Sequence, residues 1–393
     1  MATVSRGIRA PIIRQGDDIV KITVESVLQA ARQDGFTLHE RDVIAVTEAV
    51  VARADGNYAA VDDIAADVRA KLGGGHIGIV FPILSRNRFS ICLKGIARGC
   101  KKLTVLLSYP SDEVGNHLVD PDILEEAGVN PWSDILTEEQ MYRVCGGECR
   151  HPFTNVDYIA LYKELIEAEG CEAELIFANR PEVILAHTQD VICCDIHTRE
   201  RTRARIKKNG GHNILTLCDI LNAPINGSGY CPDYGLLGSN KATETTVKLF
   251  PKNAVEVAHA IQAEVLNKTG VKVEAMVYGD GAFKDPVGKI WELADPVVSP
   301  GYTEGLRGLP NELKLKFLAD NDYADLSGEA LANVIRERIR HKNRDLKGSM
   351  LSEGTTPRML TDLIGSLCDL TSGSGDKGTP IVLVQDYFVN YGD

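Results

Sequence analysis

Residues 273–289 read Val-Glu-Ala-Met-Val-Tyr-Gly-Asp-Gly-Ala-Phe-Lys-Asp-Pro-Val-Gly-Lys, an apolar run that ends on an aspartate between two glycines. The run predicts a buried strand. A carboxylate at the end of such a strand is held rigidly, and flanking glycines let a ligand approach the backbone. Asp280 and Asp285 are therefore candidate ligands for a hard cation. Lys284 and Lys289 are candidate contacts for phosphate oxygens. The alternative is a polar turn, because Asp-Gly and Asp-Pro pairs are common in turns.

Apolar runs alternate with helical patterns through the middle of the chain. Strands are predicted at residues 103–107, 174–177, 191–194 and 214–217, and helices at 158–169 and 198–208. This alternation is typical of a parallel sheet with crossover helices. We therefore expect an α/β protein.

Both ends of the chain add further elements of the same kinds. Asp17 and Asp18 precede a helical pattern that Gly35 ends. The remaining predictions are a buried strand at 42–47, a helix at 61–72, a helix at 359–370 and a strand at 380–385.

Length and composition limit the class of protein. A chain of 393 residues predicts two or three domains. No apolar run is long enough to span a membrane and no signal peptide is recognisable, so we expect a cytoplasmic protein without a membrane partner. The net charge of −12 disfavours duplex nucleic acid as a partner, because that binding depends on neutralising phosphates. Small anionic ligands remain compatible with this charge.

The ten cysteines predict reduced thiols, most of them in the core. Two clusters are candidates for zinc or nucleophile sites, namely Cys145 with Cys149 and His151, and Cys193 with Cys194 and His197. Neither has the spacing or the donor number of a zinc site, and no paired histidine is evident. Structural roles are favoured for both clusters.

A basic island interrupts this acidic chain. Residues 86–102 contain six basic residues and no acidic one, namely Arg86, Arg88, Lys94, Arg98, Lys101 and Lys102. Such a reversal of sign is compatible with an anionic substrate site or with a solvated helix face, and the sequence does not decide between them.

Two glycine-containing segments are also ambiguous. Ser372–Gly378 could cradle phosphates through its backbone or serve as a flexible linker. Gly235–Asn240 could contact a ligand or cap a helix suggested at 241–248. Neither matches the fingerprint of a P-loop or of a dinucleotide site.

Several segments, taken in order, carry a resemblance to one known family. They are Gly7-Ile-Arg-Ala-Pro-Ile-Ile-Arg-Gln-Gly-Asp-Asp18, the stretch 42–56, Gly235-Leu-Leu-Gly-Ser-Asn240, Asp280, Thr361-Asp-Leu-Ile364 and the stretch 373–384. Together they resemble the γ-glutamyl ligases of the deazaflavin coenzyme F420, which use GTP and a divalent metal to join glutamate to a carboxylate. The resemblance covers residues 1–80 and 225–393, and we find no counterpart for 81–224.

The resemblance implies roles for individual residues. Asp280 matches a metal ligand, and with Lys284 it is the expected catalytic residue. The implied ligands of Mg²⁺ or Mn²⁺ are Asp280, Asp285 and Asp233. The implied nucleotide contacts are Arg53, which stands where a lysine is usual, with Ser239, Asn240, Lys289, Asp362, Gly373, Gly375 and Gly378.

One position departs from the family pattern. Leu237 stands where the family has a second metal-binding aspartate, and a leucine cannot bind a cation. Either Asp233, Glu244 or Asp285 takes that place, or this protein binds metal differently.

We therefore expect a ligase-like core, residues 1–80 plus 225–393, that binds metal and GTP. Residues 81–224 are expected to form an inserted α/β domain that holds an anionic carboxylate acceptor through Arg86, Arg88, Lys94 and Arg98. The resemblance further implies an interlocked homodimer and a reaction through an acyl phosphate that glutamate captures.

Three alternatives are open from the sequence. One is the same chemistry on a folate or pterin acceptor, or with another amino acid as nucleophile. Another is a nucleotide-binding protein that kept the fold and lost catalysis, for which Leu237 is the argument. An α/β oxidoreductase is disfavoured because the glycine fingerprint is missing.

Overall fold

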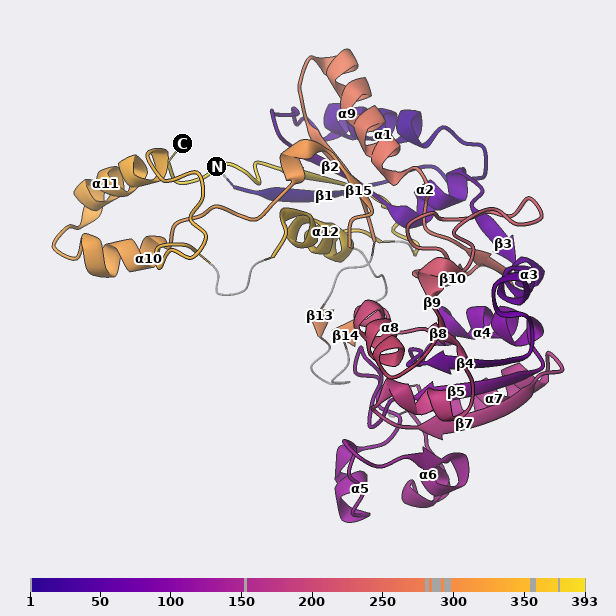
Figure 1. Cartoon of the computed structure of the whole chain (residues 1–393). Helices are drawn as coiled ribbons and strands as arrows, with labels where there is room; N and C mark the ends of the chain where they lie inside the picture. Colours follow the sequence, from indigo (N-terminus) through magenta and orange to yellow (C-terminus); the bar gives the residue numbers. More distant parts are fainter. Residues whose placement is uncertain are drawn as a thin grey trace.

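A computed structural model of the chain describes residues 2–151, 154–279, 283–284, 291–292, 298–353, 358–373 and 375–392, with only the backbone described at 283–284 and 291–292. These residues form an upper lobe around one sheet, a lower lobe around a second sheet, and a projecting arm of helices (Figure 1).

The upper lobe is built on sheet A, whose strands come from both ends of the chain. In spatial order they are β1 (Val4–Ile8), β16 (Ile381–Gln385), β2 (Val43–Thr47), β12 (Glu274–Tyr278) and β15 (Gly301–Tyr302). β2 and β12 run parallel, and the other neighbouring pairs are antiparallel. The expected α/β class, with a core assembled from both chain ends, is confirmed.

Helices cover both faces of sheet A. On one face α1 (Ile19–Asp34) and α9 (Ala254–Thr269) bury Val27 and Ile261 against Ile44, and on the other face Ile364 of α12 (Leu360–Thr371) packs against the sheet. The Asp18 side chain accepts the N–H of Lys21 at 3.0 Å at the start of α1, and Gly35 ends that helix in the left-handed conformation, as predicted. α2 (Glu48–Ala54) follows β2 directly.

The lower lobe is built on sheet C. Its spatial order is β6 (Leu136–Thr137), β7 (Glu172–Phe177), β5 (Lys102–Leu107), β4 (His76–Val80), β8 (Asp190–Cys193) and β9 (Asn213–Thr216). All of these strands except β6 are parallel. The chain builds β4, β5 and β7 outward in one direction, then returns to the other side of β4 for β8 and β9. The strand order therefore reverses between β4 and β8.

Helices cover both faces of sheet C as well. The hydrophobic core on one face includes α3 (Val61–Leu72), α4 (Phe89–Arg98) and α7 (Tyr158–Glu167), and the other includes η1 (Pro181–Ala186) and α8 (Arg199–Lys208). Gly95 lets α3 approach α4, because a Cβ there would lie 2.5 Å from Ile64. Shorter elements complete the lobe, namely α5 (Pro121–Glu126), α6 (Glu138–Val144) and η2 (Leu217–Asp219).

A small sheet B lies between the lobes. Its order is β10 (Asn240–Lys241), β11 (Thr246–Lys248) and β3 (Tyr58–Ala60). The helix expected at 241–248 is therefore wrong. Thr246 and Val247 are β-branched residues that favour a strand, and pairing of β11 with β3 fixes this choice.

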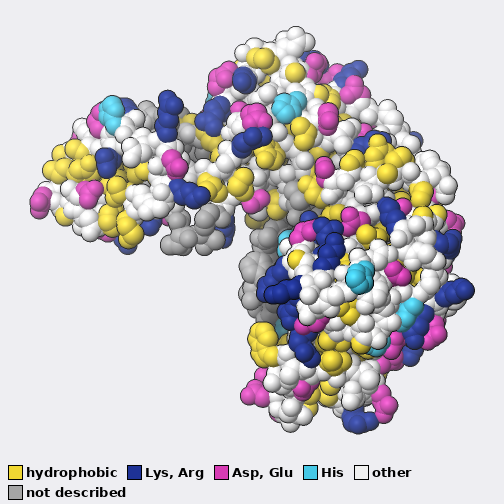
Figure 2. All heavy atoms as spheres, viewed as in Figure 1, with side chains coloured by type: hydrophobic (Ala, Val, Ile, Leu, Met, Phe, Trp, Pro, Cys, Tyr) yellow, Lys and Arg dark blue, Asp and Glu magenta, His cyan; other side chains and the backbone are white. Residues whose placement is uncertain are grey.

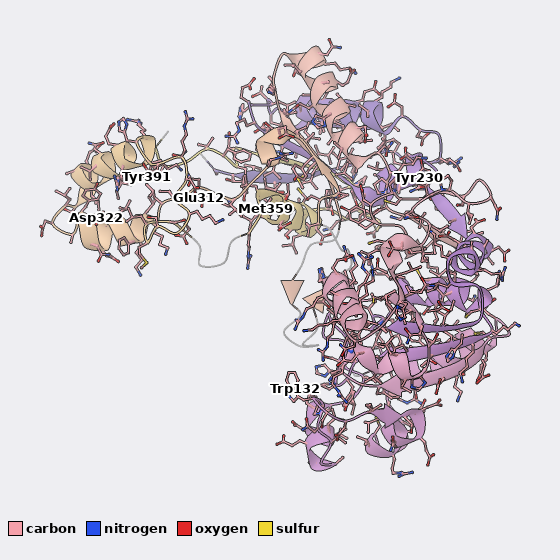
Figure 3. All side chains as sticks on the ribbon, in the orientation of Figure 1. Trp132, Tyr230, Glu312, Asp322, Met359 and Tyr391 are labelled. Atoms are coloured by element: carbon pink, nitrogen blue, oxygen red, sulfur yellow. A yellow bond between two sulfur atoms is a disulfide. The ribbon has the colours of Figure 1, made fainter. Side chains whose placement is uncertain are left out.

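The arm is a helical extension with a small core of its own. It contains α10 (Leu315–Phe317), the π-helical turn η4 (Leu318–Asp322) and α11 (Gly328–Arg340), and its core includes Leu318, Ile335 and Ile339. Figure 3 labels Glu312 where the arm leaves the upper lobe and Asp322 within it. The remaining elements are η3 (Glu304–Leu306), β13 (Phe283–Lys284) and β14 (Trp291–Glu292).

Two further observations bear on the sequence analysis. Cys145 and Cys149 form a disulfide, so the expectation of reduced thiols is wrong for this pair. Gly146 and Gly147 both have positive φ and turn the chain back, which leaves the two Cα atoms 5.4 Å apart. Among the described helices, none has the length and apolar character needed to cross a bilayer.

Candidate functional site

Three strands of sheet A end or begin along one edge of the sheet, the edge at which the parallel strands β2 and β12 have their carboxyl ends. The parallel strands β2 and β12 are in register with Thr47 beside Tyr278, so both carboxyl ends leave at this edge. β16 is antiparallel to β2, and the Thr47 N–H donates to the Pro380 carbonyl at 3.0 Å just before β16 begins. We call this the convergent edge of sheet A, formed by Thr47, Glu48, Gly279, Gly373 and residues 375–380.

A buried ion pair lies at the convergent edge. Glu48 is the first residue after β2, and both of its carboxylate oxygens lie 2.8 Å from the Lys248 Nζ. The exposed fractions of the two side chains are only 5% and 12%. Lys248 lies on β11 of sheet B, so this pair joins sheet A to the segment that leads back to the lower lobe. Because each buried charge is compensated by the other, the pair fixes the Glu48 side chain in place and ties sheet A to sheet B.

The glycine-rich segment, of which the structure describes Gly373 and residues 375–378, forms a loop at the same edge. The Thr379 N–H donates to the Gly373 carbonyl at 3.0 Å, and the Ala10 N–H donates to the Gly378 carbonyl at 3.1 Å. Gly378 has a φ of +62°, and a Cβ at Gly375 or Gly378 would meet no atom within 4 Å. The loop is thus tied at its base and open at its tip, which is the form that lets backbone N–H groups reach an anion.

Asp362 is exposed in the first turn of α12, which packs under the strands of this edge. The Ser299 hydroxyl donates to the Thr361 carbonyl at 3.1 Å, and the Gly279 N–H donates to the Val298 carbonyl at 2.7 Å. This chain of contacts links the start of α12 to the end of β12. The structure thereby places Asp362, Gly373, Gly375 and Gly378 around one edge.

The other residues expected at the metal and nucleotide are placed differently. Arg53 is exposed in the last turn of α2. Asp280, Asp285 and Lys289 lie outside the described residues, as does the side chain of Lys284. Asp233 is exposed in the segment before Gly235. Within the described residues, the only cluster of three candidate metal ligands is His39, Asp42 and Asp386, at the opposite end of β2.

Ser239 lies in the lower lobe, whereas Asn240 lies in sheet B between the lobes. The Ser239 hydroxyl is 3.2 Å from the Cys92 Sγ on α4 and only 2% of the residue is exposed, while Asn240 pairs with Lys248 in sheet B. Leu237 is also buried, 1% exposed, in the core of the lower lobe. The position that departs from the family pattern therefore packs in the core of the lower lobe.

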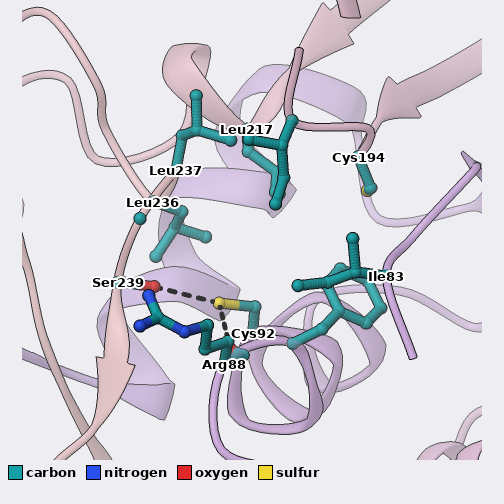
Figure 4. A pocket seen from close by; sticks show the side chains of 11 residues that line it. Ile83, Arg88, Cys92, Cys194, Leu217, Leu236, Leu237 and Ser239 are labelled. Carbon is teal, nitrogen blue, oxygen red and sulfur yellow. Dashed lines mark hydrogen bonds between the residues drawn. The ribbon is translucent and has the colours of Figure 1, made fainter. Parts of the chain in front are cut away.

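Ser239 and Leu237 line a pocket that we call the switch-point crevice. It lies where the strand order of sheet C reverses, beside the residues that follow β4 and β8. Figure 4 shows Leu237 and Leu217 on one side of the space, Ile83 and Cys194 on another, and Arg88 beside Ser239. Burial raises the pKa of the Cys92 thiol to about 11, so this cysteine is protonated and is no nucleophile at neutral pH.

The basic island does not form one compact patch, which corrects the expectation from the sequence. Arg86 and Arg88 precede α4 at the carboxyl end of sheet C. Arg98, ten residues along α4 and about 15 Å away, binds Asp62 and Glu169 at 2.7 Å each. Lys94 lies between them, with its Nζ 3.4 Å from the Glu244 carbonyl. The helix runs antiparallel to the strands and so carries its two ends to opposite edges of the sheet.

The carboxyl end of sheet C also gathers histidines. Arg86 lies within hydrogen-bonding reach of Tyr158, and the ring of Tyr158 meets that of His151 edge-on with centroids 5.8 Å apart. Burial, with His117 and Arg86 nearby, lowers the pKa of His151. This end of the sheet therefore combines basic and neutral nitrogen donors next to an apolar crevice.

Sequence reasoning missed Lys248 and the role of Glu48, and it missed the charge of α8. Glu48 follows a buried apolar strand just as Asp280 does, which is a signal that could have been used. α8 reads Arg-Glu-Arg-Thr-Arg-Ala-Arg-Ile-Lys-Lys, six basic residues and one acidic. Figure 2 shows Lys and Arg side chains gathered over this helix. Some of them are paired, as Arg203 is with Asp219 and Arg205 with Glu182.

Comparison with known proteins identifies one family. The family described as F420-0:gamma-glutamyl ligase matches residues 7–386, a span that includes the arm, nearly all of both sheets and residues 81–224, for which the motifs alone gave no counterpart. No curated protein matches the chain in a direct comparison of sequences. Members of this family are GTP-dependent acid–amino-acid ligases that add glutamate to a carboxylate acceptor. The chain belongs to the F420-0:gamma-glutamyl ligase family.

Proposed function

We propose that the protein joins L-glutamate to a small carboxylic acid in two steps, with the convergent edge of sheet A binding GTP. An oxygen of the acceptor carboxylate attacks the γ-phosphorus and GDP leaves, which forms an acyl phosphate. The amine of glutamate then attacks the carbonyl carbon, and inorganic phosphate leaves as the amide forms. The observation that carries this proposal is the meeting, at one edge, of the glycine loop, Asp362 and the Glu48–Lys248 pair in a member of this ligase family.

The donors of the edge fit a nucleotide. Gly375 and Gly378 leave the loop backbone open, and a polyphosphate needs such unobstructed N–H groups. We assign Gly373, Gly375, Gly378 and Asp362 to this contact. Arg53, Lys284 and Lys289 are proposed as further contacts on the evidence of the family motifs and of their charge.

The metal would be Mg²⁺ or Mn²⁺, which when bound would draw charge from the phosphates. Glu48 supplies a carboxylate at the convergent edge, but Lys248 already binds both of its oxygens. We therefore assign the metal to Asp280, Asp285 and Asp233, and we assign to Lys248 the task of holding Glu48 in place. Asp280 follows Gly279 directly at the end of β12 and is our first candidate.

The lower lobe is proposed to select the acceptor. Residues 81–224 supply most of sheet C, while 1–80 and 225–393 supply sheet A, and we propose that this division separates acceptor choice from nucleotide chemistry. Of the four arginine and lysine residues expected at the acceptor, Arg86 and Arg88 lie at the carboxyl end of sheet C. Arg98 is engaged with Asp62 and Glu169 at the other edge. Acceptor binding is therefore assigned to Arg86 and Arg88.

The burial of Leu237 bears on the alternative of a protein without catalysis. That alternative depended on the loss of a metal ligand at this position. Leu237 is buried in the core of the lower lobe, and we propose that catalysis is retained with the metal held by Asp280, Asp285 and Asp233 in its place.

The test is nucleotide cleavage that depends on both substrates. Purified protein is incubated with GTP, Mg²⁺, glutamate and a panel of deazaflavin, folate and pterin carboxylates, and GDP and amide products are followed by mass spectrometry. We expect GDP only when glutamate and an acceptor are both present. GTP cleavage at the same rate with and without glutamate would overturn the proposal.

A homodimer is proposed as the assembly. The arm projects from the upper lobe and exposes apolar side chains, including Met350 at 75% and Tyr391 at 51%. Such surfaces are typical of contacts between subunits. Sedimentation should give a dimer, and deletion of residues 312–353 should give a monomer. A monomeric intact protein would contradict this assembly.

A further inference from the structure

Two free cysteines meet at the amino end of sheet C. Cys100 lies between α4 and β5, and Cys171 lies between α7 and β7. Their Sγ atoms are 3.6 Å apart, which is van der Waals contact, although the two residues are 71 positions apart in the sequence. The parallel strands β5 and β7 are neighbours in register, so the turns that lead into them lie side by side. Neither cysteine has a role in the proposed function.

The contact is close enough to become a covalent bond. A disulfide holds its sulfur atoms at about 2.05 Å, so these two have to approach by about 1.6 Å. Rotation of a side chain between staggered rotamers moves a sulfur atom by more than this. The backbone beside the pair is already joined, because the Glu172 N–H donates to the Lys101 carbonyl at 2.9 Å. The cross-link is therefore within reach of side-chain movement.

The two thiols differ in how readily they lose a proton. The Cys100 Sγ lies 3.4 Å from the Ile96 carbonyl, so its S–H has an acceptor at the end of α4. Hydrogen bonding between the two sulfurs lowers the pKa of the Cys171 thiol and raises the pKa of the Cys100 thiol. Arg69, which donates to the Arg98 carbonyl at 2.9 Å, adds positive charge nearby. Cys171 therefore loses its proton first and is the nucleophile of the pair.

The other free cysteines lack this activation. Every cysteine of the chain lies within the described residues, and burial raises the pKa of the remaining free thiols, namely Cys92, Cys193, Cys194, Cys218, Cys231 and Cys368. A protonated thiol is a poor nucleophile. Only 3% of Cys171 is exposed and Cys100 is partly exposed, so a small oxidant reaches this pair more readily than a bulky one.

We infer that Cys100 and Cys171 form a reversible oxidation site, at which a small peroxide converts the two thiols into a disulfide between the end of α4 and the start of β7. The Cys171 thiolate attacks an oxygen of hydrogen peroxide, the O–O bond breaks, and the leaving hydroxide takes up the proton that Cys171 released. Cys171 is then a sulfenic acid. The Cys100 sulfur attacks the Cys171 sulfur, the S–O bond breaks, and a second water leaves with the Cys100 proton. The two thiols thereby lose two electrons, which reduce the peroxide to water.

The full chain, as purified, is treated with hydrogen peroxide in slight excess, its remaining thiols are blocked, and its peptides are mapped without reduction. We expect two peptides joined through Cys100 and Cys171, with the mass of two hydrogens lost, and dithiothreitol should abolish the link. The oxidised chain should also unfold at a higher urea concentration, because the link closes a long loop in the unfolded chain.

Single variants separate this mechanism from unselective oxidation. Cys100→Ser leaves Cys171 without the thiol that resolves its sulfenic acid, so dimedone should label Cys171 about tenfold more than in the unaltered chain. Cys218→Ser removes another partly exposed free cysteine and should cross-link as the unaltered chain does.

Circular dichroism shows whether the variants fold, and if Cys100→Ser does not fold, the peptide map of the unaltered chain decides alone. Three results would overturn the inference. They are the absence of a Cys100–Cys171 link, new links among other cysteines in equal yield, and equal dimedone labelling of Cys171 with and without Cys100. None of these readouts uses nucleotide cleavage, so failure of the proposed function would be seen separately.

Discussion

The convergent edge of sheet A and the carboxyl end of sheet C are both places where parallel strands end, yet they differ in chemistry. The first offers an open glycine backbone and a buried ion pair between Glu48 and Lys248. The second offers an apolar crevice with Arg88 beside it. Phosphate chemistry needs fixed charge and is the same for every acceptor, whereas recognition of an acceptor needs shape and hydrophobic contact. The two lobes are thus expected to respond to mutation in different ways.

The largest effect is expected at Asp280, which we place at the metal. Asp280→Asn removes a negative charge from the cation and should lower glutamate-dependent GDP release by about a thousandfold or more, as expected when metal stabilisation of several kcal/mol is lost. Calorimetry with Mn²⁺ should show weaker binding with every acceptor. Asp322→Asn, on the arm, is the control. Unchanged Mn²⁺ affinity in Asp280→Asn would remove this residue from the site.

The next effect tests the buried ion pair of the convergent edge. Lys248→Met leaves the Glu48 carboxylate buried without this cation, which should lower the free energy of unfolding by about 3–5 kcal/mol. Urea denaturation measures it. Lys241→Met, which breaks the exposed pair with Glu244, is the matched control and should cost under about 1 kcal/mol. Equal losses in the two variants would mean that burial gives the Glu48 pair no special importance.

At the carboxyl end of sheet C, a smaller effect depends on pH. The pKa of His151 is lowered in the folded state because of burial, so the unfolded chain takes up this proton first as pH falls below about 6.5. His151 should therefore make stability fall with pH from that point down to its lowered pKa, by at most about 1.4 kcal/mol per pH unit. His151→Asn should flatten this part of the curve, while the exposed-histidine control His259→Asn should not. A curve of unchanged slope in His151→Asn would contradict the assignment.

The smallest effect on acceptor binding is expected at Arg98. Its partners Asp62 and Glu169 lie at the edge of sheet C away from the crevice. Arg98→Met should leave the KM for acceptor unchanged, and its cost in stability should exceed the roughly 1 kcal/mol of an exposed pair, because the Glu169 side chain is only 10% exposed and loses this cation. Arg86→Met, at the other end of the island, should raise that KM. A rise in KM for both variants would restore the single basic patch that the sequence suggested.

Much of the architecture could be predicted because it depends on local signals. The apolar runs at 42–47 and 273–278 became β2 and β12, and the caps of α1 lie at Asp18 and Gly35 as expected. Strand β4 was missed, because its five residues follow three glycines and begin with a histidine. A short run with weak flanks is recognised mainly through its partners in a sheet.

The site was harder to predict because its contacts are distant in sequence. Glu48 and Lys248 are separated by 200 positions, and no local pattern announces their pairing. The packing role of Leu237 depends on contacts with the lower lobe, and a sequence motif alone does not show these contacts. The prediction that the basic island forms one patch failed for a geometric reason. A count of charges along a helix ignores that the two ends of the helix reach opposite edges of a sheet.

Sheet B has a consequence for how such a protein can change over evolutionary time. The chain enters the lower lobe after β3 and comes back through β11, and these two strands are hydrogen-bonded neighbours, with Ala59 opposite Val247. The two chain connections between the lobes, β3 and β11, therefore lie side by side. A module attached in this way can be exchanged for another without rerouting any strand of sheet A. On the proposed division of labour between the lobes, exchange of the lower lobe would change the acceptor and leave the phosphate chemistry of sheet A in place.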